Sequence, residues 1–314
     1  MMTRIAIVCA WPKSDPAAHE LLAVRRPGVR LETLESRSLG LRVPGGVTAD
    51  GAPLQYDAYL VRSLNPWGCI QVQYDLIELL SLSGYPVINQ PHALSLAESK
   101  LQTSYLLAQA GIPTPRTVVA PDGAAAEAAL AEFGRGVVKP IYGALGEGLL
   151  LLTAGQDEER LKKYAEDGPV YIQEYLPAGW RDLRILVLGG RMLTAAYREA
   201  APGEWRANVS QGGRCVPCEP SRELVSLAIE AARVVGLDYA GVDLIEGPHG
   251  YLVVEVNGSP GWQGVAQATG CDVAGALVDY VVGAAQAKRE PHVNANDQEY
   301  AGSAAAGAGE SMSH

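Results

Sequence analysis

Two carboxylates and an amide near the C-terminal end are the side chains whose types and spacing most clearly suggest chemistry. Asp243 lies in one apolar run, and Glu255 and Asn257 lie two positions apart in the next. Side chains alternate along a strand, so Glu255 and Asn257 share one face. A five-residue turn over 247–251 would place Asp243 directly across from Glu255, whereas an even-numbered turn would not. Oxygen ligands grouped in this way suit Mg²⁺ that bridges nucleotide phosphates; a solvated strand edge is the alternative.

A lysine and a glycine-rich loop form a second group. Lys139 ends an apolar run, and Gly143, Gly146 and Gly148 follow it closely. The backbone N–H groups of such a loop can cover phosphates. The loop lacks the Gly-Lys-Ser/Thr of a Walker A motif, and no helix opens after it as a dinucleotide fingerprint requires. A plain turn is the alternative, and the nearby Lys139 favours phosphate binding.

Other polar side chains follow expected strands. The segment Gln173-Glu174-Tyr175 closes an apolar run, where backbone groups could meet an adenine. Arg198, Arg206 and Asn208 lie on one stretch that could clamp a γ-phosphate. An exposed basic hairpin is the alternative reading of this stretch.

Arg62 ends an expected strand of the N-terminal region, and Trp67 lies in the loop after it, Ser63 to Gly68. Ligands of doubly wound sheets bind where the strands end. A guanidinium can hold a carboxylate or phosphate through two hydrogen bonds, and an indole can stack on a planar ring. A surface ion pair and a packing tryptophan are the alternative.

The elements that must position these groups alternate between short apolar runs and longer helical stretches, which is typical of α/β layers. We expect Gly111 to cap the helix before it and Gly189-Gly190 to form a hairpin turn. The expected helices are Pro16–Arg25, Gln71–Leu82, Leu94–Ala110, Ser221–Val235 and one that ends near Ala285. The expected strands are Ile5–Cys9, Val29–Leu34, Ala58–Arg62, Val87–Ile88, Thr117–Ala120, Gly136–Lys139, Gly148–Leu152, Val170–Glu174, Leu183–Leu188, Arg191–Tyr197, Gly241–Ile245 and Leu252–Val256.

The composition favours several domains. The chain has 314 residues, of which 48% are hydrophobic and 19% charged, enough for more than one core. We expect an N-terminal α/β domain (1–90), a small α+β domain with the glycine loop (91–175) and a C-terminal domain with the metal residues (176–286). The last segment, 287–314, has few large apolar groups and is expected to be disordered.

Charge and cysteine content limit the partners. The formal net charge is −10, which disfavours nucleic acid. No apolar run approaches the ~20 residues of a membrane-spanning helix. The five cysteines are an odd number in a large chain, so we expect reduced thiols and a cytoplasmic protein. Cys215 and Cys218 form an isolated C-x-x-C to which we assign no metal.

In their order, these motifs resemble the RimK-like ATP-grasp carboxylate–amine ligases of the α-L-glutamate ligase family, which includes a tetrahydromethanopterin:glutamate ligase branch. The similarity extends from about Ile88 to Val281 and is loose before it. It rests on Ile88-Asn89-Gln90, Ser99-Lys100-Leu101, Val138-Lys139 with the glycine loop, Gln173-Glu174-Tyr175, Asp182-Leu183-Arg184, Trp205-Arg206-Ala207-Asn208, Ala240-Gly241-Val242-Asp243 and Glu255-Val256-Asn257-Gly258-Ser259-Pro260-Gly261.

The resemblance implies an ATP-grasp fold, in which a doubly wound pre-ATP-grasp domain precedes two α+β subdomains that hold ATP between them. By position, it implies that Lys100 and Lys139 hold phosphates, that Glu174 and Tyr175 line the adenine, and that Asp182 meets the ribose. The remaining roles that it implies are phosphate and metal-side contacts for Arg206 and Asn208, support of an acyl-phosphate by Arg198, and Mg²⁺ or Mn²⁺ ligation by Asp243, Glu255 and Asn257.

The chemistry implied by the resemblance is amide formation. A carboxylate acceptor attacks the γ-phosphate of ATP, and the amine of an amino acid, most often glutamate in this family, displaces phosphate from the acyl-phosphate. Arg62 and Trp67 would then bind the acceptor, which we expect to be a small coenzyme such as tetrahydromethanopterin or a deazaflavin. The acidic surface disfavours the alternatives of a ribosomal protein tail and an acidic amino-group carrier protein. A kinase and a non-catalytic nucleotide-binding module are the non-ligase alternatives. We also expect a homo-oligomer.

Overall fold

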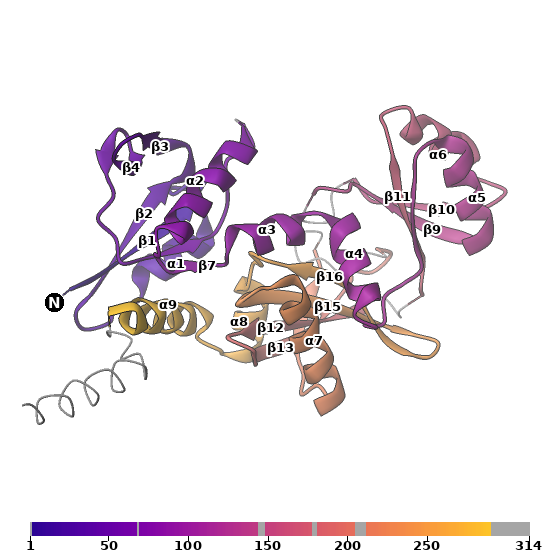
Figure 1. Ribbon diagram of the computed structural model, residues 1–314. Helices are drawn as coiled ribbons and strands as arrows, with labels where there is room; N and C mark the ends of the chain where they lie inside the picture. Colours follow the sequence, from indigo (N-terminus) through magenta and orange to yellow (C-terminus); the bar gives the residue numbers. More distant parts are fainter. Residues whose placement is uncertain (1, 68, 144–147, 178–180, 205–211, 290–314) are drawn as a thin grey trace, which may run out of the picture.

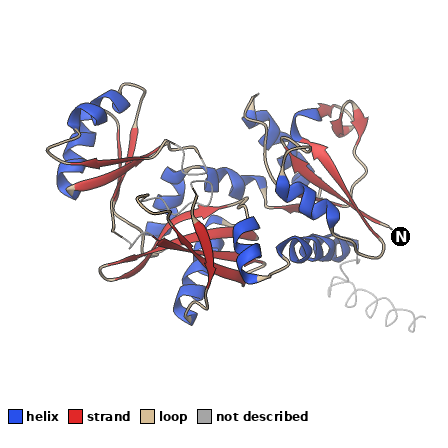
Figure 2. Ribbon diagram, turned by 180° about the vertical axis from the view of Figure 1, so that it is seen from behind, coloured by secondary structure: helices blue, strands red, loops and turns tan. Residues whose placement is uncertain are grey.

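The computed structural model of the chain describes residues 2–67, 69–143, 148–177, 181–204 and 212–289. The described strands form three larger sheets and one small one. The sheet that comes last in the chain lies in space between the other two larger sheets, as Figure 1 and Figure 2 show from opposite sides. The predicted site residues Gly146, Arg206 and Asn208, and residues 290–314 of the predicted tail, lie outside the described residues.

The first sheet is parallel, with the strand order β2-β1-β6-β7. Its strands are β1 (Thr3–Cys9), β2 (Val29–Glu35), β6 (Ala58–Val61) and β7 (Val87–Ile88). One face packs against α1 (Pro16–Ala23) and α9 (Val273–Arg289), and the other against α2 (Ile70–Leu82) (Figure 1). Alternate residues of β1 enter the two cores, with Ile5 and Ile7 on the α1 side and Ala6 and Val8 on the α2 side. The predicted doubly wound layer is confirmed.

A small antiparallel sheet between β2 and β6 was not predicted from the sequence. It follows the 3₁₀ turn η1 (Ser36–Ser38) and contains β3 (Leu39–Arg42), β4 (Gly46–Ala49) and β5 (Ala52–Pro53). Each strand has at most four residues and is interrupted by glycine, proline or arginine. Such strands are too short for an alternating pattern to be recognised.

The expected single helix from Leu94 to Ala110 is two helices, α3 (Pro91–Glu98) and α4 (Lys100–Gln109). The break occurs because Ser99 is extended, with φ −91° and ψ 101°, and its side chain accepts a hydrogen bond from the backbone of α4. The Lys100 N–H donates to the carbonyl oxygen of Ile141 at 3.1 Å. This contact ties the start of α4 to the strand end that carries Lys139.

The second sheet is antiparallel, with the order β10-β9-β11-β8. The helices α5 (Gly123–Phe133) and α6 (Glu158–Ala165) cover one face. That face is closely packed: a Cβ on Gly136 would lie 2.8 Å from Ile172. The other face carries Lys139 and Gln173. The strands are β8 (Thr117–Ala120), β9 (Arg135–Lys139), β10 (Leu150–Thr153) and β11 (Val170–Glu174).

The third sheet is antiparallel, with the order β14-β13-β12-β15-β16. One face packs against α7 (Arg222–Val235), which begins after Ser221 as predicted, and part of the other against α8 (Gln263–Thr269). The predicted two-residue turn Gly189-Gly190 is present, since Leu188 pairs with Arg191. The strands are β12 (Arg181–Leu188), β13 (Arg191–Glu199), β14 (Arg214–Pro217), β15 (Tyr239–Gly247) and β16 (Gly250–Asn257).

The end of the chain returns to the beginning. Val278 and Val281 of α9 pack with Ile5 of β1, although α9 follows the third sheet in the sequence. The domain limits at residues 90, 175 and 286 stay predictions. No single helix in the part of the chain that the structure describes has the length and apolarity to cross a membrane; α8 and α9 reach them only as a pair, bent by 110°.

Candidate active site

Asp243 on β15 lies directly opposite Glu255 on β16, as the sequence predicts. The two strands are joined by the two-residue turn Pro248-His249, which is the even-numbered case, and not by the five-residue turn that would have produced this pairing directly. The register shifts next to Asp243, where Val254 has no partner on β15. This β-bulge moves β16 by one residue and restores the pairing that an even-numbered turn would otherwise lose.

The Asp243 carboxylate is buried between two arginines. Arg184 donates to it from Nε and from Nη2, the latter at 2.7 Å from Oδ2, and Arg198 donates from Nη2 at 2.7 Å. Arg198 also holds Asp182 through two hydrogen bonds of 2.6 and 2.7 Å. Burial alone would raise the pKa of Asp243, but the two guanidinium groups hold it below its usual value. Gly241 leaves room for this cluster, since a Cβ there would lie 3.2 Å from Arg184.

The role of Arg184 was not predicted from the sequence. The signal was present, because Arg184 lies two residues from Asp182 and so shares its face of β12. Its partner, however, is Asp243 on the neighbouring strand, and that contact depends on the register between β12 and β15.

Two lysines approach the same face from other elements. The Nζ of Lys100 at the start of α4 lies 3.8 Å from Oε1 of Glu255. Lys139 at the end of β9 is close enough to be influenced by the charges of Glu255, Lys100 and Asp243. Burial lowers the pKa of Lys139 to about 8. The structure therefore brings the two predicted phosphate-binding lysines together with Glu255 and Asp243.

Gln173 is a buried polar residue, and no individual role was predicted for it from the sequence. Its Oε1 accepts a hydrogen bond from Nζ of Lys139 at 2.6 Å. Its Nε2 donates to Oγ1 of Thr117 at 3.1 Å and to the hydroxyl of Tyr171 at 3.2 Å. The Tyr171 hydroxyl lies 2.7 Å from Oγ of Ser104 on α4. This network of hydrogen bonds holds the ammonium group of Lys139 in place.

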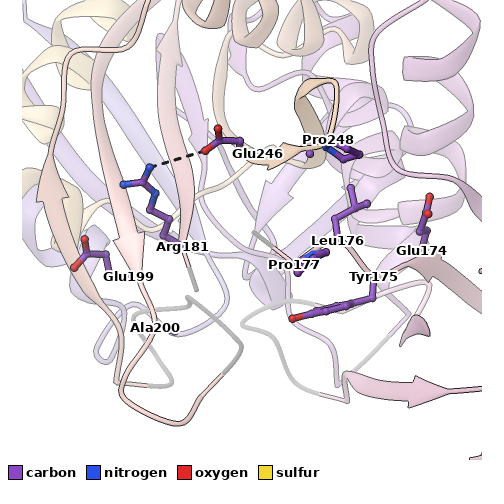
Figure 3. A pocket seen from close by; sticks show the side chains of 10 residues that line it. Glu174, Tyr175, Leu176, Pro177, Arg181, Glu199, Ala200, Glu246 and Pro248 are labelled. Carbon is purple, nitrogen blue, oxygen red and sulfur yellow. Dashed lines mark ion pairs between the residues drawn. The ribbon is translucent and has the colours of Figure 1, made fainter. Parts of the chain in front are cut away.

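The predicted adenine residues lie apart from the lysines. The Glu174 side chain is on the opposite face of β11 from Gln173, where Arg116 donates two hydrogen bonds of 2.8 and 2.9 Å to it. Glu174 and Tyr175 line a pocket of about 870 Å³ (Figure 3). Its other wall includes Arg181, whose Nη2 lies 4.0 Å from Oε2 of Glu246. The remaining lining residues are Gly247 and, labelled in Figure 3, Leu176, Pro177, Glu199, Ala200 and Pro248.

The oxygen donors of the predicted metal site are of the types that magnesium takes. Glu255 and Asn257 share a face of β16, and Asp243 lies opposite Glu255. The two oxygens of Asp243 already accept hydrogen bonds from Arg184 and Arg198. Within the described ranges, no group of three or more histidine, cysteine or acidic side chains is arranged to hold a metal. The arginines occupy both oxygens of Asp243, so Glu255 and Asn257 are the better placed donors, and an ion bound largely through nucleotide phosphates would need only one or two carboxylates from the protein. Magnesium ligation by Asp243, Glu255 and Asn257 stays a prediction.

Arg62 and Trp67 have different environments. Arg62 is only 8% exposed, and its Nη1 donates to Oγ of Ser259 at 2.9 Å and to the carbonyl oxygen of Pro260 at 3.3 Å. Its guanidinium lies over the ring of Trp262, 4.8 Å from the centre. Arg62 thus reaches the segment that follows Asn257. Trp67 is 81% exposed.

Asn89 holds the same segment and was also missed as a site residue. Its Nδ2 donates to the carbonyl oxygens of Tyr239 and Gly258, each at 2.6 Å, and its Oδ1 accepts from the Tyr239 N–H at 2.8 Å. Tyr239 begins β15, and Gly258 follows the last residue of β16. Asn89 therefore joins both strands of the hairpin that carries Asp243 and Asn257.

Comparisons with known proteins identify the family and the fold. Residues 97–281 match the RimK-like ATP-grasp domain. The chain is 34% identical to the tetrahydromethanopterin:α-L-glutamate ligase of Methanosarcina acetivorans over 72% of this chain and 79% of that protein. It is 36% identical to the probable α-L-glutamate ligase 2 of Hahella chejuensis over 73% of this chain and 76% of that protein. The solved structure of the ATP-grasp ligase PsnB with a minimal precursor superposes with a TM-score of 0.73 at 24% identity, covering 90% of this chain and all of that one.

The described residues have the ATP-grasp fold, which the solved structures of ATP-grasp ligases share. The chain belongs to the RimK-like ATP-grasp family and is an ATP-dependent ligase. The family and the fold predicted from the motifs are confirmed.

Proposed function

We propose that this enzyme adds L-glutamate to a carboxylate of a small coenzyme through an acyl-phosphate formed with ATP and Mg²⁺. The observation that carries the proposal is the convergence of Lys100, Lys139 and Glu255 beside the Asp243–Arg184–Arg198 cluster. Relatives named as tetrahydromethanopterin:α-L-glutamate ligases support the coenzyme as acceptor and glutamate as amine donor.

The site has charges where each step needs them. An acceptor carboxylate oxygen bonds to the γ-phosphorus as the bond to the β-phosphate oxygen breaks, and ADP leaves. Lys100 and Lys139 would neutralise the phosphates, and Glu255 and Asn257 would hold Mg²⁺, which supplies charge neutralisation across them. Arg198 would steady the acyl-phosphate, with Asp182 fixing its orientation.

In the second half of the reaction, the neutral amine of glutamate attacks the acyl carbon, the C–O bond to phosphate breaks, and the amine loses a proton. Because inorganic phosphate is a good leaving group, the protein contributes mainly position and charge. Arg62 would hold the acceptor next to the segment after Asn257, and Trp67 would contact its ring. Glu174 and Tyr175 would border the adenine, and Asp182 the ribose.

The proposal is tested with purified enzyme, ATP, Mg²⁺, glutamate and tetrahydromethanopterin or another candidate coenzyme. We expect ADP, and an acceptor whose mass increases by one glutamyl residue. Hydroxylamine added without glutamate should trap the acyl-phosphate as a hydroxamate. A phosphorylated acceptor that never forms an amide would contradict the proposal and indicate a kinase. Glutamylation of a protein tail instead of a coenzyme would contradict the acceptor.

We also propose that the enzyme is a cytoplasmic homo-oligomer. ATP and free glutamate, its proposed substrates, are both available in the cytoplasm. Light scattering of the purified full chain measures the mass in solution, and a monomer at micromolar concentration would contradict the oligomer.

A further inference from the structure

Two exposed tryptophans contact each other beside the proposed acceptor site. Trp11 is 39% exposed and Trp67 is 81% exposed. Their ring centres are 5.5 Å apart, and the ring planes meet at 73°. We call Trp11 and Trp67 the tryptophan pair. Two indoles at this angle form a corner with one wall on each ring, and a flat ligand can stack on one wall while its edge meets the other.

The tryptophan pair lies where a parallel sheet binds ligands. Trp11 follows the end of β1, and Trp67 follows the end of β6, the neighbouring strand. The carboxyl ends of parallel strands form one edge of the sheet. Arg62, which directly follows β6, reaches Ser259 in the C-terminal part of the chain. This edge therefore contacts, through Arg62, the segment that follows β16.

The backbone under the tryptophan pair is well fixed. The carbonyl oxygen of Trp11 accepts hydrogen bonds from the N–H groups of Ser14 and Asp15 at 3.0 and 3.1 Å. The Trp67 N–H donates to Oδ1 of Asn65 at 2.9 Å. Asn65 is itself buried and exchanges two hydrogen bonds with Gln73 of α2. Exposed rings on a fixed backbone lose little entropy when a ligand covers them, which is typical of a binding surface.

The charge beside the tryptophan pair matches a carboxylate. Arg62 is held rigidly by Ser259, Pro260 and the ring of Trp262. Its Nε is buried and has no hydrogen-bond partner among the residues that the structure places. A guanidinium has five N–H donors, and the contacts of Arg62 with Ser259 and Pro260 are made by Nη1 alone. A carboxylate is the group that a guanidinium holds best.

We propose that the tryptophan pair binds a planar conjugated ring of the acceptor while Arg62 binds a carboxylate of the same molecule. Trp11 is thereby a specificity-determining residue for acceptors that have such a ring. The inference rests on the proposed function, because that function makes the ligand of Arg62 and the tryptophan pair the acceptor. Arg62 contacts the segment that follows the proposed metal ligand Asn257, so it would hold the acceptor's carboxylate there. The test of the inference measures binding alone and needs no turnover.

The probes are folic acid, which has a planar pterin ring and carboxylates, and glutarate, which has carboxylates without a ring. Affinities are measured by titration calorimetry with the full-length enzyme and Mg²⁺–ADP. We expect Trp11→Leu and Trp67→Leu each to weaken folic acid binding by about tenfold. Both variants should bind glutarate as the unaltered enzyme does.

Tyr105→Leu is the matched control, because Tyr105 is 63% exposed on α4, away from the tryptophan pair. It should leave both affinities unchanged, and all variants should keep the melting temperature of the unaltered enzyme. Unchanged folic acid affinity in Trp11→Leu, an equal loss for glutarate, or no binding of folic acid by the unaltered enzyme would each overturn the inference. A missing glutamylated product in the turnover assay would contradict only the proposed function.

Discussion

Lys139 donates a hydrogen bond from Nζ to Oε1 of Gln173 at 2.6 Å, and Gln173 is held from behind by Thr117 and Tyr171. The ammonium group therefore has a fixed place on the face of the second sheet that turns away from α5 and α6. A lysine held in this way meets a phosphate without first losing the freedom of its side chain.

Replacing Gln173 with leucine removes the acceptor and leaves Lys139 loosely placed. A hydrogen bond to a charged group contributes about 1.5–3 kcal/mol, so we expect the affinity for Mg²⁺–ADP to fall at least about tenfold. Titration calorimetry measures this change. The control is Gln71→Leu, whose exposed side chain bonds Asp75 on α2. Equal affinity for Mg²⁺–ADP in Gln173→Leu and Gln71→Leu would show that Gln173 does not position Lys139 for the nucleotide.

Lys139 should make nucleotide binding depend on pH. Burial lowers its pKa from 10.5 to about 8, so the ammonium is charged below about pH 8 and increasingly neutral above it. Affinity for Mg²⁺–ADP should therefore fall as the pH rises above 8. The free energy of unfolding should rise between pH 8 and 10.5, because Lys139 is still protonated in the unfolded chain in this range but largely neutral in the folded protein.

Lys139→Arg separates this cause from others. A guanidinium stays charged at every pH in question, so the variant should lose the decline above pH 8. Nucleotide affinity measured from pH 7 to pH 9.5 in both proteins decides the matter. Parallel declines in the two proteins would assign the pH dependence to another group.

Asp243 and Glu255 on the hairpin should respond differently to neutralisation. Asp243→Asn leaves Arg184 without its buried counter-charge, while Arg198 keeps Asp182, and we expect this to cost about 3–5 kcal/mol in the free energy of unfolding. The Glu255 side chain is 30% exposed and lies 3.8 Å from Lys100, so Glu255→Gln should change stability by less than about 1 kcal/mol. Urea denaturation measures both values.

Glu255→Gln should have a large effect on activity although its effect on stability is small. Glu255→Gln removes a proposed magnesium ligand and should abolish ADP release while the protein stays folded. Full ADP release in Glu255→Gln would show that this carboxylate does not bind the metal. Asp243→Asn with the stability of the unaltered enzyme would show that Arg184 does not need its partner.

Asn89 should affect magnesium dependence without touching the metal. Asn89→Ala removes three hydrogen bonds at the ends of β15 and β16, so we expect Asn257 to be less well placed. The Mg²⁺ concentration for half-maximal ADP release should rise by about three- to tenfold. Leu80→Ala is the control, since it opens a cavity in the first domain and lowers stability far from the hairpin. If Leu80→Ala raised the half-maximal Mg²⁺ concentration by the same factor, the effect of Asn89→Ala would be a general loss of stability and not a loss of Asn257 positioning.

The sequence predicted the strands of this fold better than their connections. Alternation and apolar runs locate β1, β11 and β15, because buried strands leave a continuous apolar record. The split at Ser99 is invisible in a helical pattern that continues across it, and it becomes clear only from the extended backbone of Ser99 and the contact of Lys100 with Ile141. The bulge at Val254 likewise leaves no mark in the sequence, although the pairing of Asp243 with Glu255 depends on it.

The site was predictable where residues that act together are close in the sequence. Glu255 and Asn257 share a strand, so their common face follows from spacing alone. Arg184, Gln173 and Asn89 act through partners on other elements, and their roles became clear only when those elements were placed side by side. A polar residue within an apolar strand, such as Arg184 or Gln173, does indicate from the sequence that a polar partner must exist, because a buried polar group needs one, but it does not identify that partner.

Arg62→Lys tests the acceptor end of the cleft. Lysine keeps the charge but cannot lie flat on Trp262, bond Ser259 and meet a carboxylate at the same time. We expect kcat/KM for the acceptor identified by mass to fall by about tenfold or more, while the affinity for Mg²⁺–ADP is kept. Arg26→Lys is the matched control, because Arg26 makes a similar two-bond contact with Asp279 on the surface. A loss confined to nucleotide affinity would mean that Arg62 serves the segment after Asn257 and not the acceptor, whereas unchanged acceptor kinetics would remove Arg62 from the site altogether.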